Sequence, residues 1–382
     1  MQPEPFAVQP KENEVIWVDM YVPVDTRPGA YMTRFTVTST QGVAFVGATL
    51  HVWNFVLPIT PSFKSAYHSS PKNQNAYMQH ELLRNRVSPD WADPDDEPTL
   101  IERWGMNAVN AWFSTGIYSK NCATTAMRPP PSVARMRRVA AQHDVKRILL
   151  FNFTADEIDR CPNQFPMLRK WASHLHAAGI KNLVTVPPIP QLQDDGTGTG
   201  QSAVDIWVAL PVHWEKWAPE ITKVQRKGDA VWSYNVLVQD GYSPKNEINF
   251  SPLDYRLNMG FISQSLGLSG FQQWAVDNWT TDPWNDITSN MRVPSDGILV
   301  YPGDDAGILG YAPSIRLKWT RDGINDFEYI EILKKLGQGP WALAKAKSIA
   351  ADWKNWTHDH VQVEKLRIEF GEQIEKTMRR AL

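Results

Sequence analysis

Strand-like and helix-like segments alternate along most of this chain, from about residue 60 to residue 336. Short apolar runs rich in β-branched and aromatic residues predict strands at residues 146–153, 182–186, 204–210, 230–237, 271–276 and 298–301. Amphipathic stretches between them predict helices, among them residues 166–178, 214–227, 252–266 and 314–336. Because parallel strands need crossover connections, this order predicts a parallel sheet covered by helices. A (β/α)8 barrel and a doubly wound sheet share the order, and the length of roughly 275 residues is that of a barrel.

The segments on either side of this region have a different character. Residues 15–22, 31–38 and 48–56 predict about three strands, which are too few for a β-sandwich of about seven. The expected fold class is therefore α/β, a (β/α)8 TIM-like barrel preceded by a small, incomplete β-sandwich segment and followed by C-terminal helices. We expect the β segment over residues 1–58, the barrel over 59–338 and a helical appendage over 339–382.

Charge and composition exclude several classes of function. The chain has 39 Lys and Arg against 41 Asp and Glu, and this near balance argues against a nucleic-acid partner. No apolar run approaches the roughly 20 residues of a membrane span, so no membrane partner is expected. Two cysteines, Cys122 and Cys161, cannot form a four-cysteine zinc site, and the sequence leaves open whether they are bonded. No metal or organic cofactor is expected. The first residues lack the features of a signal peptide, and localisation stays open.

The strongest local signal is an acid pair directly after an apolar strand. Residues 148–155 are followed by Asp156 and Glu157, and a helix is predicted only from residue 166. In a barrel of this kind the catalytic side chains lie at the carboxyl ends of the strands. A helix-capping or solvated acidic turn would have the same sequence, so residue types alone leave both interpretations open.

An adjacent acid pair suits one mechanism of glycoside hydrolysis better than another. The two carboxylates of a retaining glycosidase normally flank the scissile bond from different strands. Neighbouring Asp156 and Glu157 instead suit substrate-assisted hydrolysis, in which the 2-acetamido carbonyl of the sugar attacks the anomeric carbon. The Asp would then stabilise the acetamido group, and the Glu would act as general acid and base. The 17 Trp residues favour the same substrate class, because aromatic rings stack on the C–H faces of sugars.

With these residues in view, the sequence resembles glycoside hydrolase family 123 and the wider domain-of-unknown-function family 4091 that contains it. The resemblance rests on the order and spacing of several motifs over residues 15–336. They are YVPVDTRPGAY at 21–31, LHVWNFVLP at 50–58, the acid pair, VDIWV at 204–208, Gly228 with VWSY at 231–234, GFQQWA at 270–275, DPW at 282–284 and SIRLKWTRDGINDFEYI at 314–330.

The resemblance implies a fold, an activity and residue roles. It implies a barrel after a β-sandwich and a retaining exo-β-N-acetylgalactosaminidase with substrate assistance. Asp156 would stabilise the acetamido group and Glu157 would be the general acid/base. The partner would be a carbohydrate with a terminal β-linked amino sugar, and the setting would be exported. The chain departs from the family pattern in its few N-terminal strands and in residues 158–160, where members often have Pro after the acid pair.

Other side chains are candidates for binding the sugar because of their places in the predicted barrel. Tyr234, Trp274 and Asn278 fall at strand ends, and His68 falls at the end of the first barrel strand. Trp207 lies inside a strand and could face either way. Each of these side chains could equally be part of the core.

Two other functions remain open from the sequence. The first is a non-catalytic carbohydrate-binding barrel, since a fold does not dictate a function. The second is a glycosidase for sugars without an acetamido group. It would need a distant carboxylate, for which the candidates are Asp205, Asp240, Asp277 and Asp304.

Overall fold

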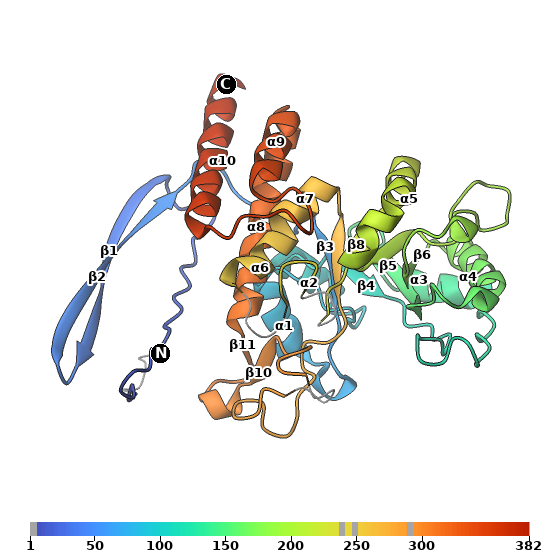
Figure 1. Cartoon of the computed structure of the whole chain (residues 1–382), viewed down its shortest axis with the longest axis horizontal. Helices are drawn as coiled ribbons and strands as arrows, with labels where there is room; N and C mark the ends of the chain where they lie inside the picture. The colour runs from blue at the N-terminus through green and yellow to red at the C-terminus, as the bar shows by residue number, and fades with distance from the viewer. Residues whose placement is uncertain (1–5, 237–240, 247–250, 289–292, 382) are drawn as a thin grey trace. The chain divides into compact units, whose positions relative to one another are not determined.

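The computed structural model describes residues 6–236, 241–246, 251–288 and 293–381 of the chain. The chain forms two compact units, Met1–Val56 and Leu57–Leu382. Figure 1 labels the helices and strands of both units.

The described part of the first unit, residues 6–56, contains a single β-hairpin. Strands β1 (Gly29–Ser39) and β2 (Gly42–Val52) pair antiparallel, with Gly29 opposite Val52 and Ser39 opposite Gly42. The prediction of a strand at residues 15–22 is wrong, because this segment has no strand pairing in the structure. Its β-branched residues favour an extended backbone, but a strand also needs an edge to pair with. The N-terminal β segment is therefore incomplete, as expected.

The second unit is a parallel barrel with helices around it. Seven strands pair in the order β3-β9-β8-β7-β6-β5-β4, and every pair is parallel. From β4 to β9, strands that follow one another in the chain are neighbours in the sheet, and β9 pairs with β3, so the barrel prediction is confirmed over the doubly wound sheet. The strands are β3 (Lys64–Tyr67), β4 (Ala108–Asn110), β5 (Leu149–Asp156), β6 (Lys181–Thr185), β7 (Ile206–Ala209), β8 (Ala230–Ser233) and β9 (Gly270–Gln273).

A short segment at residues 88–90 completes the circle between β3 and β4. The amide of Tyr67 donates to the carbonyl of Ser88 at 2.9 Å, and the amide of Asp90 donates to the carbonyl of Tyr67 at 3.1 Å. On the other side, the amide of Asn110 donates to the carbonyl of Asp90 at 3.0 Å. Residues 88–90 therefore take the eighth strand position, although only Pro89 makes a parallel bridge.

Large side chains fill the barrel interior. They include Phe151, Leu183, Ile206 and Trp232, all with at most 2% of their surface exposed. Gly270 of β9 is needed beside this core, because a Cβ there would lie 2.4 Å from the indole of Trp232. A side chain at residue 270 would displace that indole.

Helices follow the strands and cover the barrel (Figure 1). The predictions for residues 166–178, 214–227 and 314–336 agree with α4, α5 and α8 to within two residues. The predicted helix 252–266 is observed as α6 and α7 joined by a π-helical turn, Asn258–Ile262. The helices are α1 (Ala76–Arg84), α2 (Glu97–Trp104), α3 (Val133–Ala140), α4 (Phe165–Ala177), α5 (Trp214–Lys227), α6 (Pro252–Leu257), α7 (Ser263–Leu266), α8 (Ile315–Lys335), α9 (Gly339–Ile349) and α10 (His360–Ala381).

The predicted strand at 298–301 does not enter the barrel. Strand β10 (Val300–Pro302) pairs antiparallel with β11 (Tyr311–Pro313) in a separate ribbon between β9 and α8. Both ribbon strands are three residues long, and they precede the helix that returns along the barrel (Figure 1).

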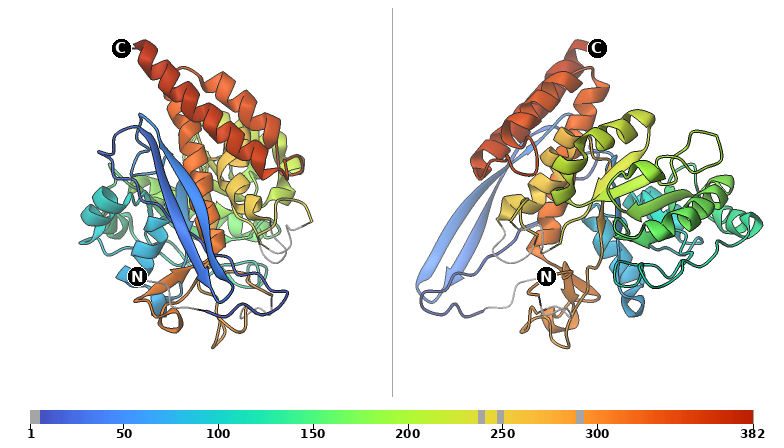
Figure 2. Two further views of the ribbon diagram at one scale, coloured as in Figure 1. Left: turned by 90° about the vertical axis from the view of Figure 1, so that its left-hand side faces the viewer. Right: turned by 45° about the vertical axis from the view of Figure 1, so that its right-hand side comes forward.

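The C-terminal helices α9 and α10 pack on the barrel unit, side by side in both views of Figure 2. A buried guanidinium of α6 connects α10 to α8. Arg256 Nε donates to Asp326 Oδ2 of α8 at 2.6 Å, and Arg256 also pairs with Glu364 of α10. Arg367 of α10 donates to the same Asp326 at 2.5 Å. Since Arg256 and Asp326 are 99% buried, both must be paired to be tolerated there.

The amino ends of the strands carry a separate ionic cluster around His176. Its Nδ1 lies 3.0 Å from Asp195 and its Nε2 lies 2.9 Å from Asp205, which directly precedes β7. Burial lowers the pKa of His176, but the hydrogen bonds and charges of the two carboxylates outweigh it, and the net shift is upward. His176 therefore favours the charged form.

In the part of the chain that the structure describes, no helix is long and apolar enough to cross a membrane.

Candidate active site

A β-bulge in β5 sets the direction of Asp156. The register between β5 and β6 shifts between Phe153 and Ala155, so that β5 contains one extra residue. Before the bulge Phe153 lies opposite Leu183, and after it Asp156 lies opposite Thr185. Leu183 belongs to the barrel interior, and alternate residues share a face, so Thr185 and Asp156 also face the interior. Without the bulge, Asp156 would face the surrounding helices.

Glu157 follows in a left-handed backbone conformation, with φ of +47°. This conformation costs a residue with a Cβ roughly 1–2 kcal/mol. It ends the strand and allows Glu157 to reach across the mouth of the barrel, where Oε1 accepts a hydrogen bond from the hydroxyl of Tyr234 at 2.7 Å. Tyr234 follows β8, three strand positions away in the sheet. The predicted residues Asp156, Glu157 and Tyr234 are thus brought together.

Thr185, the last residue of β6, joins the two acids. Its hydroxyl donates to Asp156 Oδ1 at 2.6 Å and accepts from the amide of Glu157 at 2.8 Å. The side chain is buried. Sequence reasoning missed this residue. The available signal was a hydroxyl residue at the end of the strand that follows the acid-bearing strand.

The surroundings shift the pKa values of two of these groups. Burial raises the pKa of Asp156, the charge of Glu157 raises it further, and the hydrogen bond from Thr185 opposes the shift. Burial and the charge and hydrogen bond of Glu157 raise the pKa of Tyr234 well above its usual value. Tyr234 therefore keeps its proton and remains a donor to Glu157. Perturbed carboxylates of this kind are concentrated at functional sites.

His68 lies at the end of the first barrel strand, as predicted, and pairs with Asp90 of the short eighth strand position. His68 Nδ1 and Asp90 Oδ2 are 3.0 Å apart, and the ring of Trp112 lies 5.5 Å from the imidazole. Burial lowers the pKa of His68, but the hydrogen bond and charge of Asp90, with the charge of Asp277, shift it upward overall. Trp112 is 48% exposed and has a φ of +58°. An imidazole held by a carboxylate thus follows β3, and an exposed ring follows β4. The sequence reasoning missed Asp90.

A second histidine, His213, was also missed. It follows β7 in the 3-10 turn Pro211–His213. Burial lowers the pKa of His213, so the ring is neutral near pH 7, and the charges of Asp159 and Glu157 oppose the shift. Its Nδ1 is buried without a hydrogen-bond partner among the described residues.

The remaining predicted sugar-binding residues divide into two groups. Trp274 and Asn278 follow β9, and both donate to Asp296, at 3.3 Å each. Trp207 is fully buried, and its Nε1 donates to Asp229, which directly precedes β8. Asp229 lies at the amino ends of the strands. The structure therefore does not bring Trp207 to the acid pair, because its place in β7 turns it out of the barrel interior, to which its neighbours Ile206 and Val208 belong.

The distant carboxylates considered for a different mechanism have other surroundings. Asp205 pairs with His176 at the amino ends of the strands. Asp277 accepts hydrogen bonds from the amide and hydroxyl of Ser70 and from Asn73 Nδ2. Asp304 lies in an exposed 3-10 turn after β10, and Asp240 lies outside the described residues. None of the three described carboxylates shares a hydrogen bond with Asp156 or Glu157 in the structure.

A disulfide joins the loops that follow β4 and β5. It links Cys122 to Cys161, which lies four residues beyond Glu157. Gln164 adds hydrogen bonds from its Nε2 to the carbonyls of Cys122 and Thr125. The loop that carries the acid/base candidate is therefore held to its neighbour by covalent and polar links.

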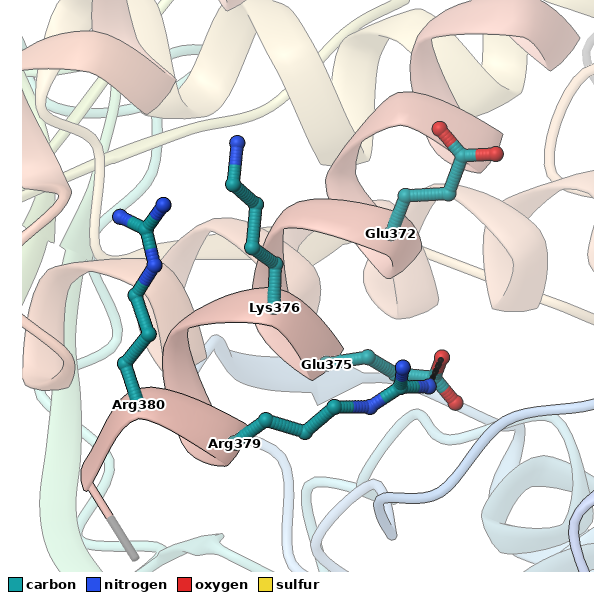
Figure 3. Close-up of a pocket in the computed structure, with 5 residues that line it drawn as sticks. All are labelled: Glu372, Glu375, Lys376, Arg379 and Arg380. Atoms are coloured by element: carbon teal, nitrogen blue, oxygen red, sulfur yellow. Dashed lines mark hydrogen bonds and ion pairs between the residues drawn. The ribbon is translucent and has the colours of Figure 1, made fainter.

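One hollow on the surface lies apart from these residues. It has a volume of about 430 Å³ and is lined by five charged side chains of α10, with an Arg379–Glu375 ion pair at 3.2 Å (Figure 3). None of its lining residues belongs to a loop that follows a barrel strand. It therefore takes no part in the candidate site.

Comparison with known families gives a direct match. Residues 195–333 match the family model described as the glycoside hydrolase 123 catalytic domain. The resemblance to glycoside hydrolase family 123 is confirmed. The match covers strands β7 to β9 and most of α8, and it begins after the acid pair. It supports hydrolysis of glycosidic bonds as the reaction class and a carbohydrate as the substrate.

The solved structures agree in fold. A family 123 glycoside hydrolase from Clostridium perfringens, whose structural analysis concerned glycolipid glycan hydrolysis, matches with a TM-score of 0.56 at 13% identity. The alignment covers 94% of this chain and 77% of that chain. At this identity the likeness shows a shared fold. No curated protein matched the sequence.

Proposed function

We propose that this glycoside hydrolase 123-type barrel is a retaining exo-β-N-acetylgalactosaminidase that uses substrate assistance. The observation that carries the proposal is the hydrogen-bonded group of Asp156, Glu157, Thr185 and Tyr234 inside the barrel mouth. Two adjacent carboxylates are held there in different directions, and each meets a different part of one sugar. An enzyme with two opposed carboxylates would need a second acid across the site.

In the first step, Glu157 in its acid form gives its proton to the glycosidic oxygen. The carbonyl oxygen of the 2-acetamido group attacks the anomeric carbon, and the bond to the leaving group breaks. The product of this step is a cyclic oxazolinium ion. Asp156 accepts a hydrogen bond from the acetamido N–H and stabilises the positive charge that develops there. The internal nucleophile is already in place, which removes much of the entropic cost of the attack.

In the second step, Glu157, now a carboxylate, takes a proton from water. The water oxygen attacks the anomeric carbon, the oxazolinium opens and the acetamido group is restored. Two displacements at one carbon retain the β configuration. The hydroxyl of Tyr234 holds Oε1 of Glu157, so that Oε2 is the atom available for proton transfer.

The other predicted residues have supporting roles in this proposal. His68, oriented by its contact with Asp90, donates to a sugar hydroxyl, and the exposed ring of Trp112 beside it offers a stacking surface. Trp274 and Asn278, which share Asp296 as a partner, form the part of the mouth that follows β9, the sheet neighbour of β3. No metal or organic cofactor is required by any step.

The test uses a chromogenic aryl N-acetyl-β-galactosaminide. We expect the wild type to release the aryl group and Glu157→Gln to lose at least 10³-fold in kcat, because it removes both the acid and the base. Asp156→Asn should lose 10²- to 10³-fold, as expected for removal of a group that stabilises developing charge. A thiazoline mimic of the oxazolinium should inhibit the wild type.

The matched control is Asp159→Asn. It removes a carboxylate two residues after Glu157, and that carboxylate makes an ion pair with Arg160 at 3.8 Å. This variant should keep turnover within a factor of about three of wild type. Equal turnover of wild type and Glu157→Gln would refute the assignment. Hydrolysis without thiazoline inhibition would indicate a sugar lacking the acetamido group. Sugar binding without turnover in the folded wild type would indicate a non-catalytic binding protein.

A further inference from the structure

Loops at the same end of the barrel form a second hollow that the proposed chemistry does not use. Its volume is about 610 Å³, within the range of small-molecule sites. Its walls come from the segments after β3 and after β9, with one residue of the β10–β11 ribbon. The lining residues are Lys72, Trp279, Thr280, Thr281, Pro283 and Pro302.

The two walls are tied together by backbone and side-chain hydrogen bonds. The pairing of β3 with β9 continues beyond the strands, because the amide of Val276 donates to the carbonyl of His68 at 2.9 Å. Further out, Asp277 accepts from the amide of Ser70 at 3.0 Å and from Asn73 Nδ2 at 2.6 Å. Lys72 lies between Ser70 and Asn73 in the chain. Its backbone is therefore fixed against the opposite wall.

The surface inside the hollow suits a sugar ring. Trp279 is held in place by its Nε1, which donates to the carbonyl of Val300 at 2.8 Å, and by its contact with the ring of Tyr311. The two prolines add apolar C–H surface, and the two threonines add hydroxyls. Apolar walls with a few polar groups are typical of carbohydrate contacts.

The charge inside the hollow is positive. Lys72 is exposed and has no ion-pair partner within the described parts of the chain. No carboxylate is among the lining residues. The carboxylate of Asp282, which lies between Thr281 and Pro283 in the chain, is exposed and accepts from Asn285 Nδ2 at 2.8 Å. An anion that enters the hollow therefore meets an unneutralised ammonium group.

The position of the hollow suits binding of the leaving group, which is the part of the glycan beyond the scissile bond. Lys72 lies four residues beyond His68, which limits the distance between their Cα atoms to about 14 Å. In an exo-acting enzyme the terminal sugar fills the mouth, and the rest of the glycan extends outward over the rim. The sugar next to the scissile bond is then the one that comes within reach of the hollow.

We propose that this hollow is a binding subsite for an acidic sugar on the leaving-group side of the substrate, with Lys72 as the group that binds its carboxylate. The inference rests on the proposed exo-glycosidase function. It predicts that the enzyme prefers glycans in which the terminal amino sugar is linked to a uronic acid over those in which it is linked to a neutral hexose.

The experiment compares two disaccharides that differ only at C6 of the second sugar. One is N-acetyl-β-galactosaminyl glucuronate and the other is the corresponding glucoside. We expect wild-type kcat/KM to be about three- to tenfold higher for the glucuronate, which is the size of a partly exposed charge-assisted contact. The preference should weaken as salt is added. Lys72→Gln should remove the preference and leave turnover of the aryl glycoside within twofold of wild type.

The matched control is Lys120→Gln, which removes one positive charge from the loop after β4 without touching the hollow. It should keep the preference. Equal kcat/KM for both disaccharides in the wild type, or a preference that survives in Lys72→Gln, would overturn the subsite. If no substrate is hydrolysed, calorimetry on Glu157→Gln separates the two proposals. If Glu157→Gln binds the glucuronate more tightly than the glucoside, and added Lys72→Gln removes this difference, the subsite is supported although the proposed reaction fails. Equal affinities for the two disaccharides would overturn the subsite.

Discussion

Replacement of Thr185 by Val tests the geometry of the candidate site most directly. The two side chains have nearly the same shape, but Val lacks the hydroxyl that donates to Asp156 and accepts from the amide of Glu157. A hydrogen bond to a charged group is worth about 1.5–3 kcal/mol, and the amide of Glu157 also loses its acceptor. At 1.4 kcal/mol for each tenfold change, kcat/KM on the aryl glycoside should fall about 10- to 100-fold.

The pH profile distinguishes this effect from a general loss of packing. The hydrogen bond from Thr185 lowers the pKa of Asp156, so its removal lets the pKa rise further. Because Asp156 acts as a carboxylate in the proposed reaction, the acid limb of kcat/KM should move to higher pH in Thr185→Val. Thr185→Ser keeps the hydroxyl and should show neither a large loss nor a shift. The reasoning fails if Thr185→Val keeps wild-type kcat/KM and an unchanged acid limb while circular dichroism shows it folded.

Three further predictions concern stability. Asp156→Asn should raise the melting temperature by about 1–3 °C at pH 7 in scanning calorimetry, because burial and the charge of Glu157 disfavour the ionised acid; an unchanged or lower value would contradict this. His176→Gln should cost about 3–5 kcal/mol in denaturant unfolding below pH 6.5, and the cost should shrink as the pH rises through the raised pKa of His176. A pH-independent cost would contradict the ionic account. Replacing Cys122 and Cys161 by Ser should lower the unfolding free energy by about 4 kcal/mol, since the bond closes a 39-residue separation; an unchanged denaturation midpoint would argue against the bond.

Periodicity predicted α4 and α5 well because each buries an apolar stripe, whereas the shorter α1, α2 and α3 were not predicted. The predicted bounds of the helix before Gly228 agree with the observed α5, and Gly228 ends it with φ of +100°. Gly337, with φ of +75°, likewise follows the end of α8. Local capping chemistry is present in the sequence itself. The ends of these two helices were therefore predictable without knowledge of the tertiary structure.

The closure of the barrel could not be predicted in the same way. Residues 88–90 are Ser, Pro and Asp, which lack the apolar and β-branched character of a strand. Their strand position comes only from hydrogen bonds to Tyr67 and Asn110 on either side. Neighbouring elements impose this conformation, so no local pattern marks it. The same holds for Trp207, whose burial away from the mouth depends on the register of β7 with its neighbours.

The candidate site shows why the acid pair was visible in the sequence while its arrangement was not. In a regular strand, Asp156 would face the helices and its neighbour would face the interior. The bulge reverses the direction of Asp156, and the left-handed turn at Glu157 then redirects the next residue as well. Both devices cost free energy, and so does the burial of a carboxylate beside another acid. Thr185 and Tyr234 offset part of this cost, because each donates a hydrogen bond to one of the two carboxylates. A solvated acidic turn would need neither the bulge nor the strained backbone nor these donors. Their presence together at one strand end therefore favours the functional interpretation of the pair over the structural one.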